Sequence, residues 1–175
     1  MAEPANLPPP QVDATAVAAP DLLAAATCYV NAGLSVIPIS ADGSKSPAWR
    51  FLPKIRKSNG EWKHSWYPYQ SRRPTPAEIE SWYSNWGPPC GLAVIGGDIS
   101  GGLEIIDFDT MELFEPWREL VASQNTTVLD RLVLVQSPRP GMHVYYRTIV
   151  PTSNYKLATR IEMDPETGMP RKKTL

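Results

Sequence analysis

Two acidic side chains one residue apart close an apolar run in "LEIIDFDT", the stretch Leu103–Thr110. If this run is a strand, Asp107 and Asp109 project from the same face, roughly 7 Å apart at the backbone. Two like charges some 6 Å apart repel by roughly 3 kcal/mol at an effective dielectric constant of about 20, so the pair is not explained by stability. Mg²⁺ or Mn²⁺ would remove the conflict, and paired carboxylates hold the metal ions of phosphoryl and nucleotidyl transfer. The alternative is a solvent-facing strand end at which Asp109 caps the following helix.

A second group of candidate residues lies in "SPRPGMHVYYR", where a predicted turn joins two strands. The turn contains Ser137, Arg139 and Gly141, and His143 lies near the start of the strand that follows it. Hydroxyl, guanidinium and free backbone N–H groups bind phosphate oxygens, and an imidazole donates to phosphate or ligates metal. We therefore expect phosphate binding here. The alternative for His143 is a structural histidine whose hydrogen bonds are satisfied within its own strand.

A third candidate site is the basic and aromatic segment 41–73, in which two acids, Asp42 and Glu61, face eight cations. The cations are Lys45, Arg50, Lys54, Arg56, Lys57, Lys63, Arg72 and Arg73, and the interleaved aromatic residues are Trp49, Phe51, Trp62, Trp66, Tyr67 and Tyr69. Cations that neutralise phosphates and rings that stack on bases are typical of strands that bind nucleic acid. The alternative is a surface loop whose rings pack on the domain. Lys45, in "GSKSPAW" after a predicted strand, is a candidate triphosphate contact.

The helices and strands that position these residues can be predicted from the spacing of apolar residues and from the glycine, proline and capping residues at their ends. Residues 20–33 have helical spacing and end at a glycine, and residues 34–40 indicate a strand in which Pro38 favours an edge or an end. The stretch "TPAEIESWYSNW" predicts a helix, because Thr75, Pro76 and Glu78 form the pattern of a capping box.

The second half of the sequence indicates two strand pairs around a helix. "GLAVIGGDISGGLEIIDFD" contains two apolar runs joined by glycines, which predicts a hairpin with Asp107 and Asp109 closing its second strand. Residues 111–123 predict a helix whose first turns Pro116 disturbs. "DRLVLVQS" and "MHVYYRT" predict a further strand pair joined across "PRPG".

Length and composition indicate one globular domain, since the chain has 175 residues of which 42% are hydrophobic. Residues 1–19 are rich in Pro and Ala and predict a disordered tail, which leaves 20–175 as the domain. The net charge of -1 argues against a uniformly basic nucleic-acid binder. No apolar run approaches the ~20 residues that cross a bilayer, and Cys28 and Cys90 lack metal-ligand spacing. We therefore expect a cytoplasmic protein with no membrane partner.

In this order, the motifs resemble the primase-polymerase (prim-pol) domain of the archaeo-eukaryotic primase superfamily, found in replication proteins of phages, plasmids and prophages. The resemblance spans about residues 21–150. It is carried by "YVNAGLSVIPI", "GSKSPAW", "TPAEIESWYSNW", "CGLAVIGGDISGGLEIIDFD" and "SPRPGMHVYYR". It implies an α+β fold, with a mixed or antiparallel sheet, flanking helices and an RRM-like catalytic core. It also implies a DNA primase or polymerase that uses Mg²⁺ or Mn²⁺.

Roles follow from the resemblance residue by residue. Asp107 and Asp109 match the metal-binding D-x-D, and His143 matches the histidine that contacts the triphosphate of the incoming dNTP or NTP. Ser137 and Arg139 lie in the turn before it, and Lys45 falls on a lysine that recurs after the first strand. Implied partners are a single-stranded DNA template or primer-template and, in a longer parent chain, a helicase domain. The basic residues Arg50, Lys54, Arg56, Lys57, Lys63, Arg72 and Arg73 are the candidate nucleic-acid contacts.

Two features depart from the family pattern. Ser137 stands six residues before His143 instead of forming a tight Ser-x-His. No third acid on a later strand is evident, because Glu162 and Asp164 lie in "RIEMDPETG", which we interpret as a polar excursion and not a strand. We therefore expect a domain incomplete at its C-terminus, with "RKKTL" beginning a strand, and a chain that is weakly active or inactive alone.

Two rival functions remain open from the sequence. A haloacid-dehalogenase-like phosphatase would use Asp107 as nucleophile and Asp109 as general acid, although the Thr or Val expected two positions later is Met111. A non-catalytic nucleic-acid-binding module would use the basic and aromatic segment alone.

Overall fold

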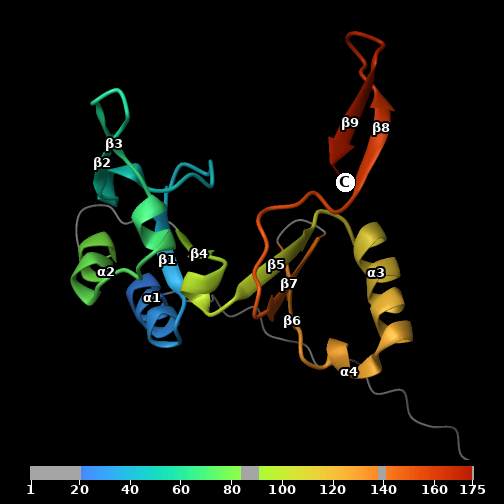
Figure 1. The fold of residues 1–175 in the computed structure, drawn as a ribbon, viewed down its shortest axis with the longest axis horizontal. Coiled ribbons are helices and arrows are strands. Elements are labelled where there is room, and N and C mark those ends of the chain that lie inside the picture. Colours follow the sequence, from blue (N-terminus) through green and yellow to red (C-terminus); the bar gives the residue numbers. More distant parts are fainter. Residues whose placement is uncertain (1–20, 84–90, 138–140, 175) are drawn as a thin grey trace, which may run out of the picture.

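The computed structural model describes residues 21–83, 91–137 and 141–174, with short helices and short strands along the chain (Figure 1). The predicted tail, the end of the predicted helix 75–86, Cys90 and Arg139 lie outside these residues. In chain order the elements are α1 (Leu22–Asn31), β1 (Ser35–Ile39), η1 (Trp49–Phe51), β2 (Lys54–Arg56), β3 (Trp62–His64), η2 (Tyr67–Gln70), α2 (Pro76–Tyr83), β4 (Gly91–Ile95), η3 (Asp98–Ser100), β5 (Leu103–Phe108), α3 (Met111–Gln124), α4 (Thr126–Leu129), β6 (Val133–Gln136), β7 (Met142–Arg147), β8 (Thr159–Met163) and β9 (Pro170–Thr174).

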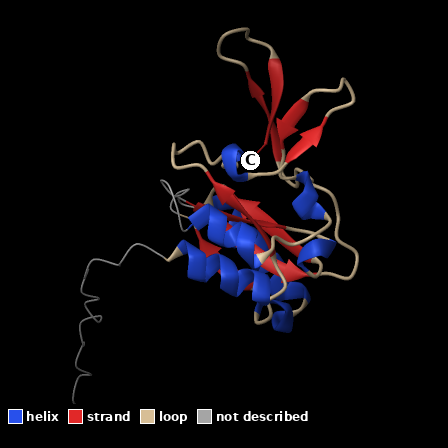
Figure 2. Ribbon diagram, turned by 90° about the vertical axis from the view of Figure 1, so that its left-hand side faces the viewer, coloured by secondary structure: helices blue, strands red, loops and turns tan. Residues whose placement is uncertain are grey.

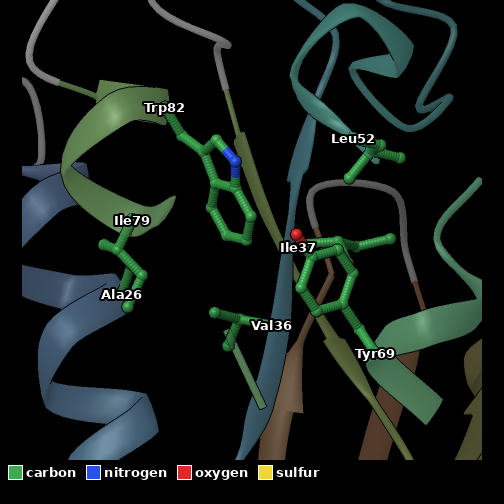
Figure 3. Close-up of a cluster of buried hydrophobic side chains, with 7 residues drawn as sticks. All are labelled: Ala26, Val36, Ile37, Leu52, Tyr69, Ile79 and Trp82. Carbon is green, nitrogen blue, oxygen red and sulfur yellow. The ribbon is translucent and has the colours of Figure 1, made fainter. Parts of the chain in front are cut away.

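The main hydrophobic core lies on the antiparallel pair β1–β4, against α1 and α2 (Figure 3). Its buried members are Ala26, Val36, Ile37, Leu52, Tyr69, Ile79 and Trp82. The rings of Tyr69 and Trp82 meet edge to face with centroids 5.6 Å apart, and the Trp82 indole N–H donates to the Phe51 carbonyl at 3.2 Å. Such a bond lets a large ring be buried without leaving its polar atom unpaired. β1 pairs with β4 alone among the described strands, so the edge position predicted from Pro38 is confirmed.

Helix α2 begins as its sequence predicts. The Thr75 hydroxyl accepts from the Glu78 N–H at 3.2 Å, and the Glu78 carboxylate accepts from the Thr75 N–H at 2.8 Å. This is a reciprocal capping box. The Glu78 carboxylate also accepts from both terminal nitrogens of Arg72 at 2.7 Å and from the Tyr69 hydroxyl at 2.9 Å. The cap of α2 is thereby tied to the buried ring of Tyr69.

The turn η3 connects the two halves of the protein. The Ser100 hydroxyl is buried and accepts from the Ser35 N–H at 2.9 Å, which links the turn to β1. Arg147 of β7 donates to the Ser100 and Gly101 carbonyls at 2.6 and 2.9 Å. Gly102 has φ +73°, and a Cβ there would lie 1.9 Å from the Thr148 carbonyl oxygen. Only glycine allows this backbone conformation and this close approach.

The predicted hairpin of β4 and β5 is wrong. β4 pairs with β1 and β5 with β7, and a single bridge, Gly97 with Leu103, joins the two strands. The glycines do reverse the chain, but the positive φ values at Gly97, Gly101 and Gly102 and the turn η3 place β5 in a separate sheet. The glycines between the two apolar runs therefore predicted the position of the turn correctly, but they did not identify which strands pair.

The second sheet has the order β5-β7-β6 and is antiparallel, which confirms the predicted pairing of β6 and β7. α3 packs against the end of β5, where the ring of Phe108 contacts Phe114 and Trp117 at centroid distances of 5.5 and 5.3 Å. The helix runs on through Pro116. On β6, Val133, Leu134 and Val135 remain exposed.

Two hairpins project from these sheets on the same side of the protein, β2–β3 and β8–β9 (Figures 1 and 2). Our interpretation of "RIEMDPETG" as a polar excursion is wrong, since Glu162 lies within β8 and Asp164 in the turn that follows. The predicted strand in "RKKTL" is confirmed as β9. Asp164 accepts from the N–H groups of Glu166 and Thr167 at 2.9 and 3.1 Å. These turn bonds and the pairing of β8 with β9 make strand structure possible despite the polar sequence.

The observed mixture of helices and small antiparallel sheets is of the α+β class, as expected. The RRM-like core stays a prediction. Among the described residues, no helix is both long and apolar enough to span a membrane. Cys28, the cysteine within the described ranges, is a free thiol.

The first prediction concerns Gly102. Gly102→Ala should lower the free energy of unfolding by about 2–5 kcal/mol, because it combines an unfavourable positive φ with a collision against the Thr148 carbonyl. Gly168→Ala is the matched control, since Gly168 also has a positive φ (+65°) but open space at its Cβ position. Urea denaturation measures both, and equal losses in the two variants would contradict the role given to the close approach.

The second prediction concerns pH. Arg72, and to a smaller extent the Thr75 N–H and the Tyr69 hydroxyl, lower the pKa of Glu78 from its ordinary 4.5 to about 2, against the opposing effect of burial. A lowered pKa stabilises the fold above pH ~4.5, and this stabilisation is lost as the pH falls toward 2. Glu78→Gln should therefore cost about 2–3 kcal/mol at pH 7 and flatten the loss between pH ~5 and 2. Glu80→Gln, on the exposed side of α2, should keep the wild-type profile in denaturation curves recorded across that range.

Candidate active site

Asp107 and His143 face each other across the pairing of β5 and β7. Directly opposed residues of an antiparallel pair place their side chains on the same face of the sheet. Nε2 of His143 lies 3.3 Å from Oδ1 of Asp107, and the Asp107 side chain is 65% exposed. The structure thus brings together two site residues that stand far apart in the sequence, and it leaves the carboxylate open to a ligand.

Tyr145 completes a row of polar groups on this face. Its hydroxyl lies 3.2 Å from Nδ1 of His143, and the two rings meet edge to face with centroids 6.1 Å apart. An ionised carboxylate only accepts, so in the neutral imidazole Nε2 carries the proton toward Asp107 and Nδ1 accepts from the tyrosine. Burial raises the pKa of Tyr145, with smaller contributions from Tyr29 and Asp107. Sequence reasoning missed this residue, although its spacing of two from His143 on one strand is a signal for a shared face.

Asp109 lies outside the strand that we expected it to end. β5 stops at Phe108, and Asp109 occupies an exposed bend before α3, whose N-cap is Thr110. The period-2 argument therefore does not extend to Asp109, and the alternative role as helix cap does not hold either.

Ser137 reaches the same end of the sheet through the β6–β7 turn. Its N–H donates to the Gly141 carbonyl at 3.1 Å. A Cβ on Gly141 would lie 2.3 Å from the Phe108 carbonyl oxygen and 3.1 Å from the Ser137 hydroxyl oxygen. Ser137 and the end of β5 are therefore close neighbours. Arg139, in the same turn, lies outside the described residues.

A cavity of about 1010 Å³ opens beside the Asp107–His143 pair, and both sheets line it. Leu92 and Val94 of β4 and Tyr29 of α1 contribute from the first half of the protein, with Asp107 the one acid among the described lining residues. Arg131, before β6, adds a cation that the sequence reasoning did not single out. The volume is at the upper end of those typical of small-molecule sites, so a nucleotide can enter.

Lys45 is not among the described residues that line the cavity. It lies in the exposed loop after β1 with φ +59°, unusual for a lysine. Asp42 organises this loop by accepting from the Ser44 N–H and hydroxyl at 3.0 and 2.6 Å, and these bonds lower the pKa of Asp42.

Several of the candidate nucleic-acid contacts are engaged within the protein. Lys57 pairs with Glu61 at 2.8 Å, and Arg72 with Glu78 at 2.7 Å. Arg73 donates to the Gly33 and Ile99 carbonyls at 2.9 and 3.2 Å. Arg50 lies over the Phe51 ring at 4.5 Å, and Lys63 over the Tyr67 ring at 5.6 Å. The eight cations of segment 41–73 are therefore not equivalent.

The donor atoms at the site fit a hard divalent cation in part. Asp107 offers an exposed carboxylate, whereas Nε2 of His143, which carries its proton toward Asp107, is suited to donating to a phosphate and not to ligating metal. Mg²⁺ keeps several waters and is commonly held by one or two carboxylates together with substrate phosphates, so a full protein cage is not required. Within the described ranges, no group of three His, Cys, Asp or Glu side chains is arranged to hold a metal.

Comparison with known families agrees with the resemblance seen in the motifs. The sequence model of the bifunctional DNA primase/polymerase N-terminal family matches residues 26–168. No curated protein and no solved structure matches the chain. The matched range covers most of the chain and includes both acids, His143 and Ser137. The chain therefore belongs to the family of bifunctional DNA primase/polymerase N-terminal domains.

Proposed function

We propose that this chain performs template-directed nucleotidyl transfer at the Asp107–His143 pair. Family membership implies DNA primase/polymerase-type activity. The observation that supports this site is the placement of a carboxylate and an imidazole 3.3 Å apart at a cavity large enough for a nucleotide. The match favours this function over a phosphatase or a non-catalytic binding module.

Asp107 and Asp109 would hold Mg²⁺ or Mn²⁺, with Asp109 reaching the ion from the bend before α3. When bound, the metal would polarise phosphate oxygens and offset the charge that develops on them. Asp109 would have to approach Asp107 for this, and the bound cation would offset the repulsion between the two carboxylates. The described residues lining the cavity add no third acid, so the remaining ligands would be water and the substrate phosphates.

His143 would bind the triphosphate of the incoming nucleotide. Its Nε2–H faces the cavity beside Asp107, and a phosphate oxygen can accept from it. The Tyr145 hydroxyl holds the other ring nitrogen and so fixes the ring orientation. Ser137, Arg139 and Lys45 are further proposed phosphate contacts, with Ser137 placed nearest to the end of β5.

The proposed partners are dNTP or NTP and a single-stranded DNA template or primer-template. The proposed setting is the replication of a phage, plasmid or prophage, in which a helicase would act with this domain. This setting rests on the resemblance of the motifs, whereas the chemistry rests on the geometry of the site.

The third prediction tests the metal-binding acids. Asp107→Asn and Asp109→Asn should each lower primer extension with Mn²⁺ or Mg²⁺ at least roughly 100-fold, a loss of about 2.7 kcal/mol of transition-state stabilisation, because each removes a charged oxygen ligand. Glu119→Gln, an exposed acid on α3, is the matched control and should extend primers normally. Wild-type extension by both Asp variants would refute the proposed site. Should wild-type turnover be too low to follow, Mn²⁺-dependent nucleotide binding by calorimetry gives the same comparison.

The fourth prediction tests the nucleotide contact. His143→Ala should weaken nucleotide binding by about 1.5–3 kcal/mol, the range of a charge-assisted hydrogen bond, and leave DNA affinity unchanged. His64→Ala is the control, because His64 is the only other histidine of the chain and bonds to the Leu52 carbonyl at 2.7 Å, away from the cavity. Titration calorimetry that finds unchanged nucleotide affinity for His143→Ala would contradict this role.

A further inference from the structure

We propose that one face of the β2–β3 hairpin, formed by Lys54, Arg56 and Trp62, binds single-stranded DNA by stacking a base on the Trp62 indole. This inference rests on the proposed function, for which it supplies a place on the protein where the template strand is held. It concerns a surface separate from the cavity that holds Asp107 and His143.

The three side chains share a face because of the strand register. Arg56 is paired with Trp62, and Lys54 with His64. Residues opposite each other, and residues two apart on one strand, project to the same side. Ile55 and Lys63, the middle pair, therefore point to the other side, where the Lys63 ammonium lies over the Tyr67 ring. The hairpin thus presents an indole opposite one cation, Arg56, and diagonal to a second, Lys54.

The Trp62 side chain is exposed on the hairpin and does not belong to the hydrophobic core. It is 66% exposed, whereas Trp82 in the core is 1% exposed. Among the described residues, no ring contact or cation–π contact involves Trp62. A ring of this size contributes to stability mainly through the area it buries, so the fold gains little from it. Stacking on a nucleotide base would bury the exposed indole face.

The charges next to Trp62 are available for phosphates. The Lys54 side chain is exposed and forms no ion pair or hydrogen bond with any other described residue. Arg56 uses Nε for the Gly60 carbonyl at 3.4 Å, and its side chain is exposed. In contrast, Glu61 neutralises Lys57 in the turn, and Arg72 and Arg73 are held by α2 and by backbone carbonyls. The structure therefore leaves two exposed cations, Lys54 and Arg56, on the face of the hairpin that carries Trp62.

The expected ligand is a single strand because the bases of a duplex are already stacked on each other. An exposed indole can stack only on a base whose face is free, and such stacking is tolerant of sequence. In Figure 1 the hairpin projects upward from the protein, on the same side as the β8–β9 hairpin.

The fifth prediction measures binding of a fluorescein-labelled oligothymidine to the full chain by anisotropy, in EDTA and without nucleotide. Trp62→Ala should weaken binding roughly 5- to 150-fold, and Trp62→Phe should lie between wild type and Trp62→Ala, because the smaller ring still stacks. Lys54→Ala should lower the slope of log K against log salt by roughly 0.7 in magnitude, the share of one phosphate on a single strand. Trp62→Ala should leave that slope unchanged.

Tyr155→Ala and Lys156→Ala are the matched controls, since they remove an exposed ring and an exposed cation from the segment before β8. Wild-type affinity in Trp62→Ala, an equal loss in Tyr155→Ala, or equally tight binding of a duplex would each overturn the proposal. Because EDTA and the absence of nucleotide exclude catalysis, the result is independent of primer extension. Wild-type DNA binding by Trp62→Ala in a chain that extends primers would overturn the hairpin's role alone, whereas Trp62-dependent binding by an inactive chain would overturn the proposed function alone.

Discussion

The arrangement of this protein depends on the bonds that converge on the turn η3 between β4 and β5. The buried Ser100 hydroxyl accepts from β1, Arg147 of β7 donates to two carbonyls of the turn, and Gly102 approaches the backbone at Thr148. Strands from both sheets are therefore fixed to one short segment. Buried polar groups are costly unless they are paired, so these bonds allow little variation in how the sheets meet. The cavity at the proposed active site lies where they meet.

The proposed active site combines a rigid part and an open part. Asp107, His143 and Tyr145 lie on paired strands, where the ladder fixes their positions and each ring nitrogen of the histidine has a partner. Asp109 and Ser137 lie at the strand ends, and Asp109 is exposed. This division suits nucleotidyl transfer, in which the groups that position the phosphates must be held in a fixed geometry while metal and substrate enter together. Residues at strand ends can approach the ligands without distorting the sheet.

The structure also divides the cations of segment 41–73 into those with partners among the described residues and those without. The basic and aromatic segment carries eight cations in the sequence, but ion pairs, backbone carbonyls and aromatic rings engage most of them. Exposed ion pairs contribute little to stability, yet they lower the local positive potential. Lys54 and Arg56, on the face of the hairpin that carries Trp62, form no ion pair with a described acid and can act on a ligand. A net charge of -1 is therefore compatible with DNA binding at a defined place.

The sequence by itself determined the local structure and the kinds of side chain available for chemistry. The capping box of α2, the edge position of Pro38, the pairing of β6 with β7 and the family followed from residues within a few positions of each other. Tertiary structure alone decided that β4 and β5 belong to different sheets, that Glu162 lies in a strand, and that Tyr145 joins Asp107 and His143. The physical reason is that capping and turns are governed by neighbouring residues, whereas strand pairing is decided by the total burial and hydrogen bonding of segments far apart in the chain. For the same reason, which cations of segment 41–73 stay free could be settled only by their partners in space.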